Sequence, residues 1–324
     1  MSPRCGDRGR GDTLTAREPF ELVIRPDEVG CRLDRILVAR EPGLSRSTWK
    51  RWLVEGRVLV DGTPVRANTR PRTGAVVHVH PPPAEPVELG AEVIALDVLF
   101  EDTHLIVIDK PAGLVVHPGP GHATGTLVNA LAERLTELVG SDPVRPGIVH
   151  RLDKDTSGVM VVAKAHEAQQ ALRRQFQAHD IERQYHAIAR GQVPTKLHLD
   201  TLHGRHPVDR KRFTSRLQRG RRAITEVQVL EPLHACALVR CRLQTGRTHQ
   251  IRMQLAERDH PLLGDPVYGR APRDPRLRAA ALKLGRQALH ASTLGFRHPL
   301  SGRYLEFASE LPHDLRVALD ALRR

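Results

Sequence analysis

The sequence predicts an α+β protein of two domains, and three features of its 324 residues lead to this prediction. The chain is longer than one compact hydrophobic core usually spans. The proline-rich stretch PPPAEPVELG, at 81–90, has no hydrophobic periodicity and predicts a stiff linker, which we place at 83–92 between the domains. Beyond it, apolar runs of strand length are separated by single helical patterns and lack the glycine fingerprint of a dinucleotide-binding fold. We therefore expect a disordered basic tail at 1–18, a small domain at 19–82 and a larger mixed domain at 93–324.

The composition excludes several classes of protein. No run of roughly 18 apolar residues occurs, so no transmembrane helix is expected, and the N-terminal stretch lacks the apolar core of a signal peptide. The four cysteines are scattered without a C-x-x-C pair, which is typical of a reducing compartment. We therefore expect a soluble, cytoplasmic, monomeric protein without membrane contact.

The net charge of +13, from 50 Lys and Arg against 37 Asp and Glu, is concentrated in two segments. Basic residues outnumber acidic ones by ten to four between 31 and 80, and by eight to one between 203 and 222. One such run is readily explained as a solvated face. Two runs that together carry the whole excess favour a polyanionic partner such as RNA.

The segment 32–80 has the pattern of two helices followed by a hairpin. Two apolar stripes at helical spacing predict the helices: Leu33, Ile36 and Leu37 in the first, and Trp49, Trp52 and Leu53 in the second. Ser45 is a suitable N-cap residue for the second helix. The pair Asp61-Gly62 predicts a tight turn between short strands, and the valines of 76–79 predict a closing strand.

The stretches RLDRIL, LSRSTWKRWLVEGRVLVDGTPV and GAVVHV resemble the RNA-binding domain named after ribosomal small-subunit protein S four. The resemblance implies that the basic helix and the hairpin bind structured RNA. It gives as candidate contacts Arg46, Lys50, Arg51 and Arg57. Asp61 stands where the family often has Asn, a small change at a turn. From the residues alone, an ordinary helical hairpin remains the alternative.

The larger domain shows strands interspersed with single helices. Leu105–Ile108 and Val159–Ala163 are continuous apolar runs and predict buried strands. A helix is expected from His166, with apolar residues four apart on one face. Alternating patterns predict further strands at 185–190 and 237–244.

The densest cluster of reactive groups is HRLDKDTSG, from His150 to Gly158. It lies between an expected strand at 147–149 and the buried strand that follows. Charged groups packed between apolar strands are costly unless they are paired, so this loop is a candidate site. Of its two aspartates, Asp155 fits a simple turn residue better than Asp153 does.

RPGIVHRLDKDTSGVMVVAK is similar to the signature motif of the RluA-type pseudouridine synthases. The similarity continues in family order through DKPAGLVVHPG, TLVNAL, IERQYHAIARG, GRHPVDRKR, TGRTHQIRMQLA and HPLLGDPVYG, and it covers about 93–310. With the basic domain in front, the RluD-like branch is the nearest. The resemblance implies a mixed, largely antiparallel sheet with flanking helices. The implied reaction breaks the glycosidic bond of uridine, turns the base and rejoins it to the sugar through carbon 5.

The resemblance also assigns the site residues. Asp153 becomes the catalytic aspartate, as a nucleophile or as the base that starts glycal formation, and the sequence leaves both open. Its countercharge is assigned to Arg252 rather than Arg247, which is expected to meet phosphate or a neighbouring strand. Helical spacing supports Arg252, because it is expected to place His249, Arg252 and Ala256 on one helical face. Tyr185 is expected to stack on the extruded base, and its hydroxyl could also move the final proton from carbon 5.

Further RNA contacts are expected at His150, Arg151, Arg210, Lys211, Arg212 and Arg247. No cofactor is expected, because the chemistry requires none. No metal is expected either, since there is no H-E-x-x-H pair and His117 and His122 lack a suitably spaced third ligand. Met253 and Gln254 stand where valine and histidine are common in the family, so a polar contact there is expected to differ.

The expected function is therefore uridine isomerisation in RNA, in the first place large-subunit (23S) ribosomal RNA. The alternatives are a transfer RNA synthase and, in a different class, a non-catalytic RNA-binding factor of ribosome assembly.

Overall fold

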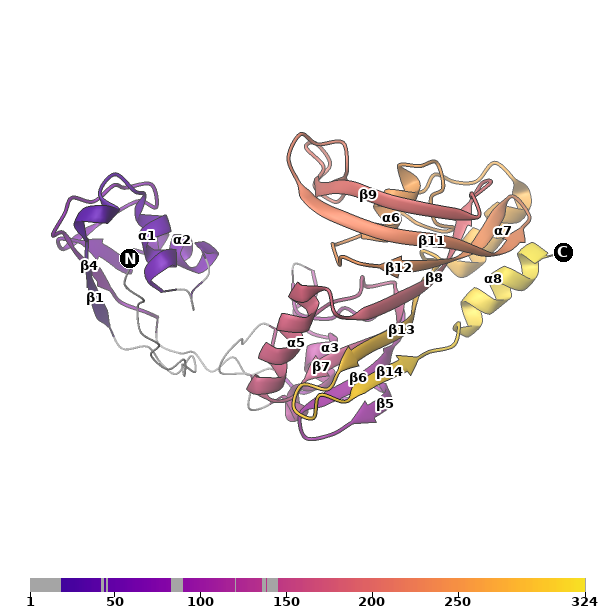
Figure 1. The fold of residues 1–324 in the computed structure, drawn as a ribbon, viewed down its shortest axis with the longest axis horizontal. Helices are drawn as coiled ribbons and strands as arrows, with labels where there is room; N and C mark the ends of the chain where they lie inside the picture. The colour runs from indigo at the N-terminus through magenta and orange to yellow at the C-terminus, as the bar shows by residue number, and fades with distance from the viewer. Residues whose placement is uncertain are drawn as a thin grey trace, which may run out of the picture. The chain divides into compact units, whose positions relative to one another are not determined.

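A computed structural model describes residues 19–41, 44, 46–82, 90–119, 121–135, 138 and 145–323 (Figure 1). The tail expected at 1–18, the N-cap Ser45 and most of the expected linker lie outside these residues. The chain divides into two compact units, Met1–Glu88 and Leu89–Arg324, which are described separately.

The first unit packs two helices on a small antiparallel sheet. The helices are α1 (Leu33–Arg40) and α2 (Arg46–Val54), and the strands, in the spatial order β1-β4-β2-β3, are β1 (Phe20–Val23), β4 (Val76–Val79), β2 (Val58–Val60) and β3 (Thr63–Pro64). Both predicted apolar stripes are buried, and the rings of Trp49 and Trp52 meet edge to face at 5.3 Å. The predicted turn places Asp61 and Gly62 in the left-handed region, at φ 48° and 78°, as a tight hairpin requires.

Ten strands of the described part of the second unit form one sheet. Its strands are β5 (Asp97–Glu101), β6 (Leu105–Lys110), β7 (Ser157–Ala163), β8 (Glu182–Arg190), β9 (Lys196–Arg205), β10 (Phe213–Thr214), β11 (Arg221–Leu233), β12 (Cys236–Leu243), β13 (Leu289–Arg297) and β14 (Tyr304–Ala308). Their order is β10-β9-β11-β12-β8-β13-β7-β6-β5, and β14 pairs with β13. Only β13 and β7 pair in parallel, so the expectation of a mixed, largely antiparallel sheet is confirmed.

Helices cover this sheet and close three apolar clusters. They are α3 (Leu127–Ala130), α5 (His166–Ala178), α6 (Gln250–Ala256), α7 (Pro275–Leu284) and α8 (His313–Arg323). In Figure 1, α5 lies along the part of the sheet that contains β7, and their side chains share one core cluster. The apolar side of α6 packs on β8, β11 and β12, while α7 and α8 pack together on another cluster. In the described residues, no helix combines the length and apolar character needed to span a bilayer.

Two local predictions are wrong. The expected strand at 147–149 is only an isolated bridge from Ile148 to Val162, because Gly147 adopts φ 69° and interrupts the extended backbone. His249 does not share a helical face with Arg252. It precedes α6 at φ 57°, since the helix begins at Gln250.

Candidate active site

Asp153 lies in the loop that leads into β7, and a tight turn fixes its backbone. The N–H of Thr156 donates to the carbonyl of Asp153 at 3.1 Å, and Leu152 is buried beneath the loop. Gly158, the second residue of β7, adopts φ 116°, and a Cβ there would stand 2.2 Å from the carbonyl oxygen of Ala291. Only glycine therefore allows β13 to approach the end of this loop so closely.

Arg252 contacts Asp153 from α6. Its Nη1 donates to Oδ2 of Asp153 at 2.8 Å, while Nε and Nη2 donate to the two oxygens of Asp265 at 2.7 and 3.0 Å. Burial alone would lower the pKa of Arg252, but its bonds to Asp265 and the charge of Asp153 outweigh burial and raise it. The guanidinium thus stays charged and is held from both sides.

Tyr185, on β8, shares a pocket with these residues. The pocket opens to solvent, and the empty space in and at the mouth of it amounts to about 360 Å³. It is lined by Arg151, Leu152, Asp153, Thr156, Tyr185, Leu243, Arg247, His249, Gln250, Ile251, Arg252 and Leu289. Burial raises the pKa of Tyr185 to about 12, and the charge of Asp153 adds to this while Arg183 opposes it. The hydroxyl therefore keeps its proton at neutral pH.

His249 is a pocket residue whose place sequence reasoning misjudged. Its Nε2 lies 3.8 Å from Oδ1 of Asp153, and its Nδ1 lies 3.2 Å from the hydroxyl of Tyr268. Burial lowers the pKa of His249, although Asp153 acts in the opposite direction. The left-handed backbone at His249 turns the chain into α6 and brings the ring to the carboxylate.

His150 anchors the loop instead of facing the pocket. Its Nε2 accepts a hydrogen bond from the N–H of Val161 at 3.1 Å, and its ring stacks on Phe176 at 4.6 Å. Burial, with the charge of Arg183, lowers the pKa of His150 to about 3, so the ring is neutral. Of the two residues before Leu152, Arg151 is the exposed one and lines the pocket.

Lys110 is a buried charged residue that sequence reasoning missed. Its Nζ donates to the carbonyls of Pro111, Leu114 and Lys154 at 2.7, 2.9 and 3.0 Å, so it joins the end of β6 to the Asp153 loop. Burial lowers the pKa of Lys110 to about 7, and the charges of Asp155 and Asp153 limit the shift. In the sequence, Lys110 could have been found from its position in Asp109-Lys110-Pro111, the polar stretch at the end of an apolar strand.

Two of the basic residues predicted to contact RNA in the second unit, Arg212 and Arg247, are linked to this site. Arg210, Lys211 and Arg212 follow β9, and the guanidinium of Arg212 lies over the ring of Tyr268 at 5.3 Å. Arg247 lines the pocket, and its Nε is 3.4 Å from the carbonyl of Arg222.

In the first unit, the four predicted RNA contacts differ in their surroundings. Arg46 donates to the buried carboxylate of Asp34 at 2.6 Å, so it also has a structural partner. Arg57 lies 2.9 Å and Arg51 3.8 Å from the Glu55 carboxylate. Lys50 is exposed on α2.

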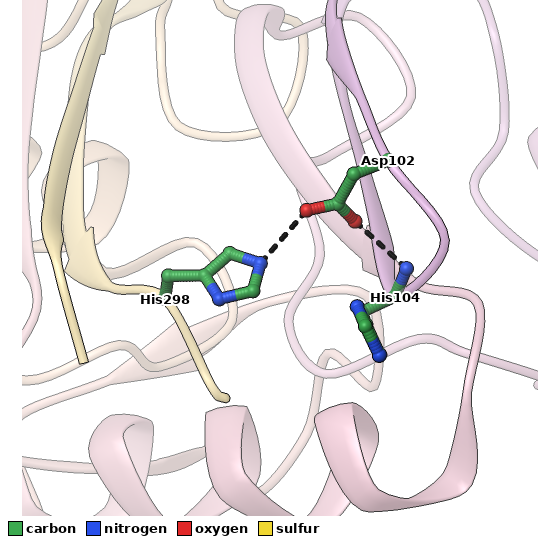
Figure 2. Close-up of side chains that lie close together, drawn as sticks. All are labelled: Asp102, His104 and His298. Atoms are coloured by element: carbon green, nitrogen blue, oxygen red, sulfur yellow. Dashed lines mark hydrogen bonds and ion pairs between the residues drawn. The ribbon is translucent and has the colours of Figure 1, made fainter. Parts of the chain in front are cut away.

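Asp102, His104 and His298 form a group that could hold a metal, since potential ligand atoms lie within 4.8 Å of one another. In Figure 2 the carboxylate of Asp102 faces the ring of His298 and the backbone of His104. Nε2 of His298 lies 2.8 Å from Oδ2 of Asp102, and the backbone N–H of His104 donates to Oδ1 of the same carboxylate. Nδ1 of His298 accepts from the N–H of Ser301 at 3.1 Å, so Nε2 carries the proton that a metal would have to replace. These hydrogen bonds join the turn that contains Asp102 to the turn that contains His298, which gives the group a structural role.

His117 and His122 flank the other histidine loop that the sequence singled out. Within it, Gly119 and His122 exchange two backbone hydrogen bonds of 2.9 Å, which is the geometry of a tight turn.

A carboxylate paired with a guanidinium in a pocket, in a chain that also has a basic unit, indicates an enzyme that acts on a polyanion such as RNA. Residues 104–257 match the family model described as RNA pseudouridylate synthase, and residues 31–77 match the S4 domain. The chain is 45% identical over 305 residues to "Ribosomal large subunit pseudouridine synthase D" of Nitrosomonas europaea, covering 94% of this chain and 88% of the relative. It is 43% identical over 316 residues to the protein of the same name from Xanthomonas campestris, covering 94% and 95%.

Among solved structures, the chain resembles "Human RNA Pseudouridylate Synthase Domain Containing 1" with a TM-score of 0.55 and 22% identity, over 70% of this chain and 89% of the other. This likeness shows the fold. The chain belongs to the RNA pseudouridine synthase family and is an isomerase that acts on RNA, so the family expected from the motifs is confirmed.

Proposed function

We propose that this chain converts specific uridines of large-subunit ribosomal RNA to pseudouridine, with Asp153, Tyr185 and Arg252 as its catalytic residues. The observation that carries the proposal is the 2.8 Å contact between Asp153 and Arg252 in one pocket with Tyr185. The printed names of the two bacterial relatives support large-subunit RNA as the substrate.

The reaction breaks the bond between C1′ of the ribose and N1 of uracil and forms a bond between C1′ and C5. The hydrogen on C5 leaves as a proton, and N1 gains one. The carboxylate of Asp153 serves as the nucleophile toward C1′ or as the base that starts glycal formation, and both roles need its ionised form. Arg252 supplies the countercharge and fixes the orientation of the carboxylate, because its other two nitrogens are already held by Asp265.

A uridine in folded RNA has to leave its stack before C1′ can be attacked. Tyr185 offers its ring to the extruded base, a contact of roughly 1–3 kcal/mol. Arg151 and Arg247 line the same pocket, which supports the proposal that they bind the flanking phosphates. Lys50, Arg51 and Arg57 of the first unit, with Arg210, Lys211 and Arg212 of the second, extend the contact to structured RNA.

The test of the proposed function is Asp153→Asn, with Asp155→Asn as a matched control in the same loop. Because C5 loses its hydrogen, RNA that carries tritium at C5 of uridine releases it on isomerisation. We expect Asp153→Asn to bind RNA like the wild type and to release no tritium, while Asp155→Asn remains active. Substantial turnover by Asp153→Asn would overturn the assignment.

The RNA substrate can be identified by carbodiimide mapping of RNA from a strain that lacks the protein. We expect pseudouridines to disappear from large-subunit ribosomal RNA. Their disappearance from transfer RNA instead would contradict the proposed substrate but leave the enzyme class intact.

We further propose that the protein acts in the cytoplasm as a monomer. Free thiols at the described cysteines Cys31, Cys236 and Cys241 support a reducing compartment. Light scattering should give the mass of one 36.1 kDa chain, and the mass of two chains would contradict this.

A further inference from the structure

Arg286 lies just before β13 and is buried, yet its guanidinium reaches two distant parts of the chain. Its Nη1 donates to the carbonyl of Asp155 at 3.0 Å, in the loop that carries Asp153. Its Nε and Nη2 donate to the two carboxylate oxygens of Asp314, on α8, at 2.6 and 3.0 Å. One side chain thus ties the Asp153 loop to the C-terminal helix.

Two residues that follow Arg286 also contact the end of the Asp153 loop and the start of β7, and one of them contacts the C-terminal segment. Nε2 of Gln287 lies 3.3 Å from Oγ1 of Thr156, and Nδ1 of His290 lies 3.0 Å from Oγ of Ser157. The other ring nitrogen of His290 lies 3.2 Å from the carbonyl of Ser309. Three consecutive residues at the end of the loop and the start of β7 are therefore held by the segment 286–290, which is in turn joined to the C-terminal segment.

The loop contacts lie next to Asp153. Asp155 follows it by two residues, and the N–H of Thr156 closes the turn on the carbonyl of Asp153. A shift of the Asp155 carbonyl would move that turn and change how the Asp153 carboxylate meets Arg252. Misplacement of a reacting group by about 1 Å can cost on the order of 100-fold in rate.

Asp314 keeps Arg286 in place. A buried guanidinium needs a carboxylate partner, and the planar fork of arginine binds both oxygens in one fixed geometry. The side chain of Asp314 is 40% exposed, so it can be changed without opening the core. Burial alone would raise its pKa, but the bonds from Arg286 hold the pKa of Asp314 below its ordinary value.

We propose that Arg286 and Asp314 are positioning residues through which α8 holds the Asp153 loop in its reactive geometry. The proposal rests on the catalytic role of Asp153 proposed above. It concerns the rate of the chemical step and leaves RNA binding to other residues.

The test compares Asp314→Asn, Asp314→Glu and Arg286→Lys in the full-length chain. Glu231→Gln is the matched control, because it removes another ion pair of α8, between Glu231 and Arg323 at 2.8 Å, which does not reach the loop. Single-turnover tritium release measures the chemical step, and filter binding measures RNA affinity.

We expect Asp314→Asn and Arg286→Lys to lower the single-turnover rate by about ten-fold or more, with RNA affinity unchanged. Asp314→Glu keeps a carboxylate for the fork and should restore most of the rate, and Glu231→Gln should match the wild type. Wild-type rates in Asp314→Asn and Arg286→Lys, an equal loss in Glu231→Gln, or a loss of RNA affinity without a loss of rate would each overturn the proposal.

Asp153→Asn, measured in parallel, separates this proposal from the function on which it rests. If Asp153→Asn is inactive while the Asp314 and Arg286 variants turn over normally, only the positioning role fails. If Asp153→Asn turns over, the proposed function itself fails.

Discussion

Asp265 holds the guanidinium of Arg252 from behind, with both carboxylate oxygens bonded to it at 2.7 and 3.0 Å. Only Nη1 is left to meet Asp153, at 2.8 Å. Asp153, Arg252 and Asp265 thus form two ion pairs in series, and the side chain of Asp265, at the inner end, is fully buried.

Asp265→Asn should therefore lower both stability and activity. Removing one partner of a buried ion pair costs about 3–5 kcal/mol, and Arg252 would lose the group that fixes its orientation. Urea unfolding measures the first effect and tritium release the second. An unchanged unfolding midpoint with full turnover would contradict this role.

The Asp265–Arg252 pair predicts that stability falls at acidic pH. Burial alone would raise the pKa of Asp265, but Arg252 and the backbone N–H groups of Tyr268 and Val267 hold this pKa below its ordinary value. A lowered carboxylate pKa stabilises the fold above the unfolded value, near pH 4, and this contribution is lost as pH falls through the folded value. The wild type should lose stability on acidification more steeply than Asp265→Asn, as measured by urea unfolding between pH 6 and about pH 3.

Lys110 should produce a dependence of the same sign at alkaline pH. Burial lowers its pKa from 10.5 to about 7, so between these values the unfolded chain binds a proton that the folded chain has released. The free energy of unfolding should therefore rise with pH from 7 to about 10, and Lys110→Met should remove this rise. The variant also leaves the carbonyl of Lys154 without its ammonium partner, so we expect slower tritium release. A rise that persists in Lys110→Met would contradict the assignment.

The ring and the hydroxyl of Tyr185 can be tested separately by two substitutions. We expect Tyr185→Phe to bind substrate RNA as tightly as the wild type, because the stacking face is kept. Tyr185→Leu should weaken binding by roughly 1–3 kcal/mol. Equal affinity of both variants, measured by filter binding, would show that no base stacks on this residue. Turnover of Tyr185→Phe then reports whether the hydroxyl moves the final proton.

The first unit should supply much of the salt-dependent affinity for RNA. Deleting residues 1–82 should weaken binding and flatten the slope of log affinity against log salt, because fewer counterions are released. In the full-length chain, Lys50→Gln should lower affinity at little cost in stability, while Arg46→Gln should also destabilise the unit by removing a partner of Asp34. An unchanged slope after the deletion would contradict the binding role.

The elements that could be predicted from the sequence are those with strong local patterns. The apolar runs of β6 and β7 are buried as expected, and the two tryptophans lie on one buried helix face. The long strands β9 and β11 were missed because one face of each is exposed and carries charged residues such as Asp200 and Arg222, which pair across the strands at the sheet surface.

In the site, the family motifs indicated Asp153, Tyr185 and Arg252, but the residues that hold them were not apparent. Asp265 lies in a loop 13 residues after Arg252, and Arg286 contacts a carbonyl 131 residues away. Such partners are set by the packing of distant elements, and no local period in the sequence marks them.

The strand order also has a consequence for synthesis on the ribosome. β13 lies between β7, which follows the Asp153 loop, and β8, which carries Tyr185, although it comes about a hundred residues after β8 in the chain (Figure 1). A nascent chain that has not yet extended past Arg297 lacks the strand that joins these two parts of the site. Arg297 must therefore have been synthesised before the Asp153 loop and the strand of Tyr185 can be joined through β13.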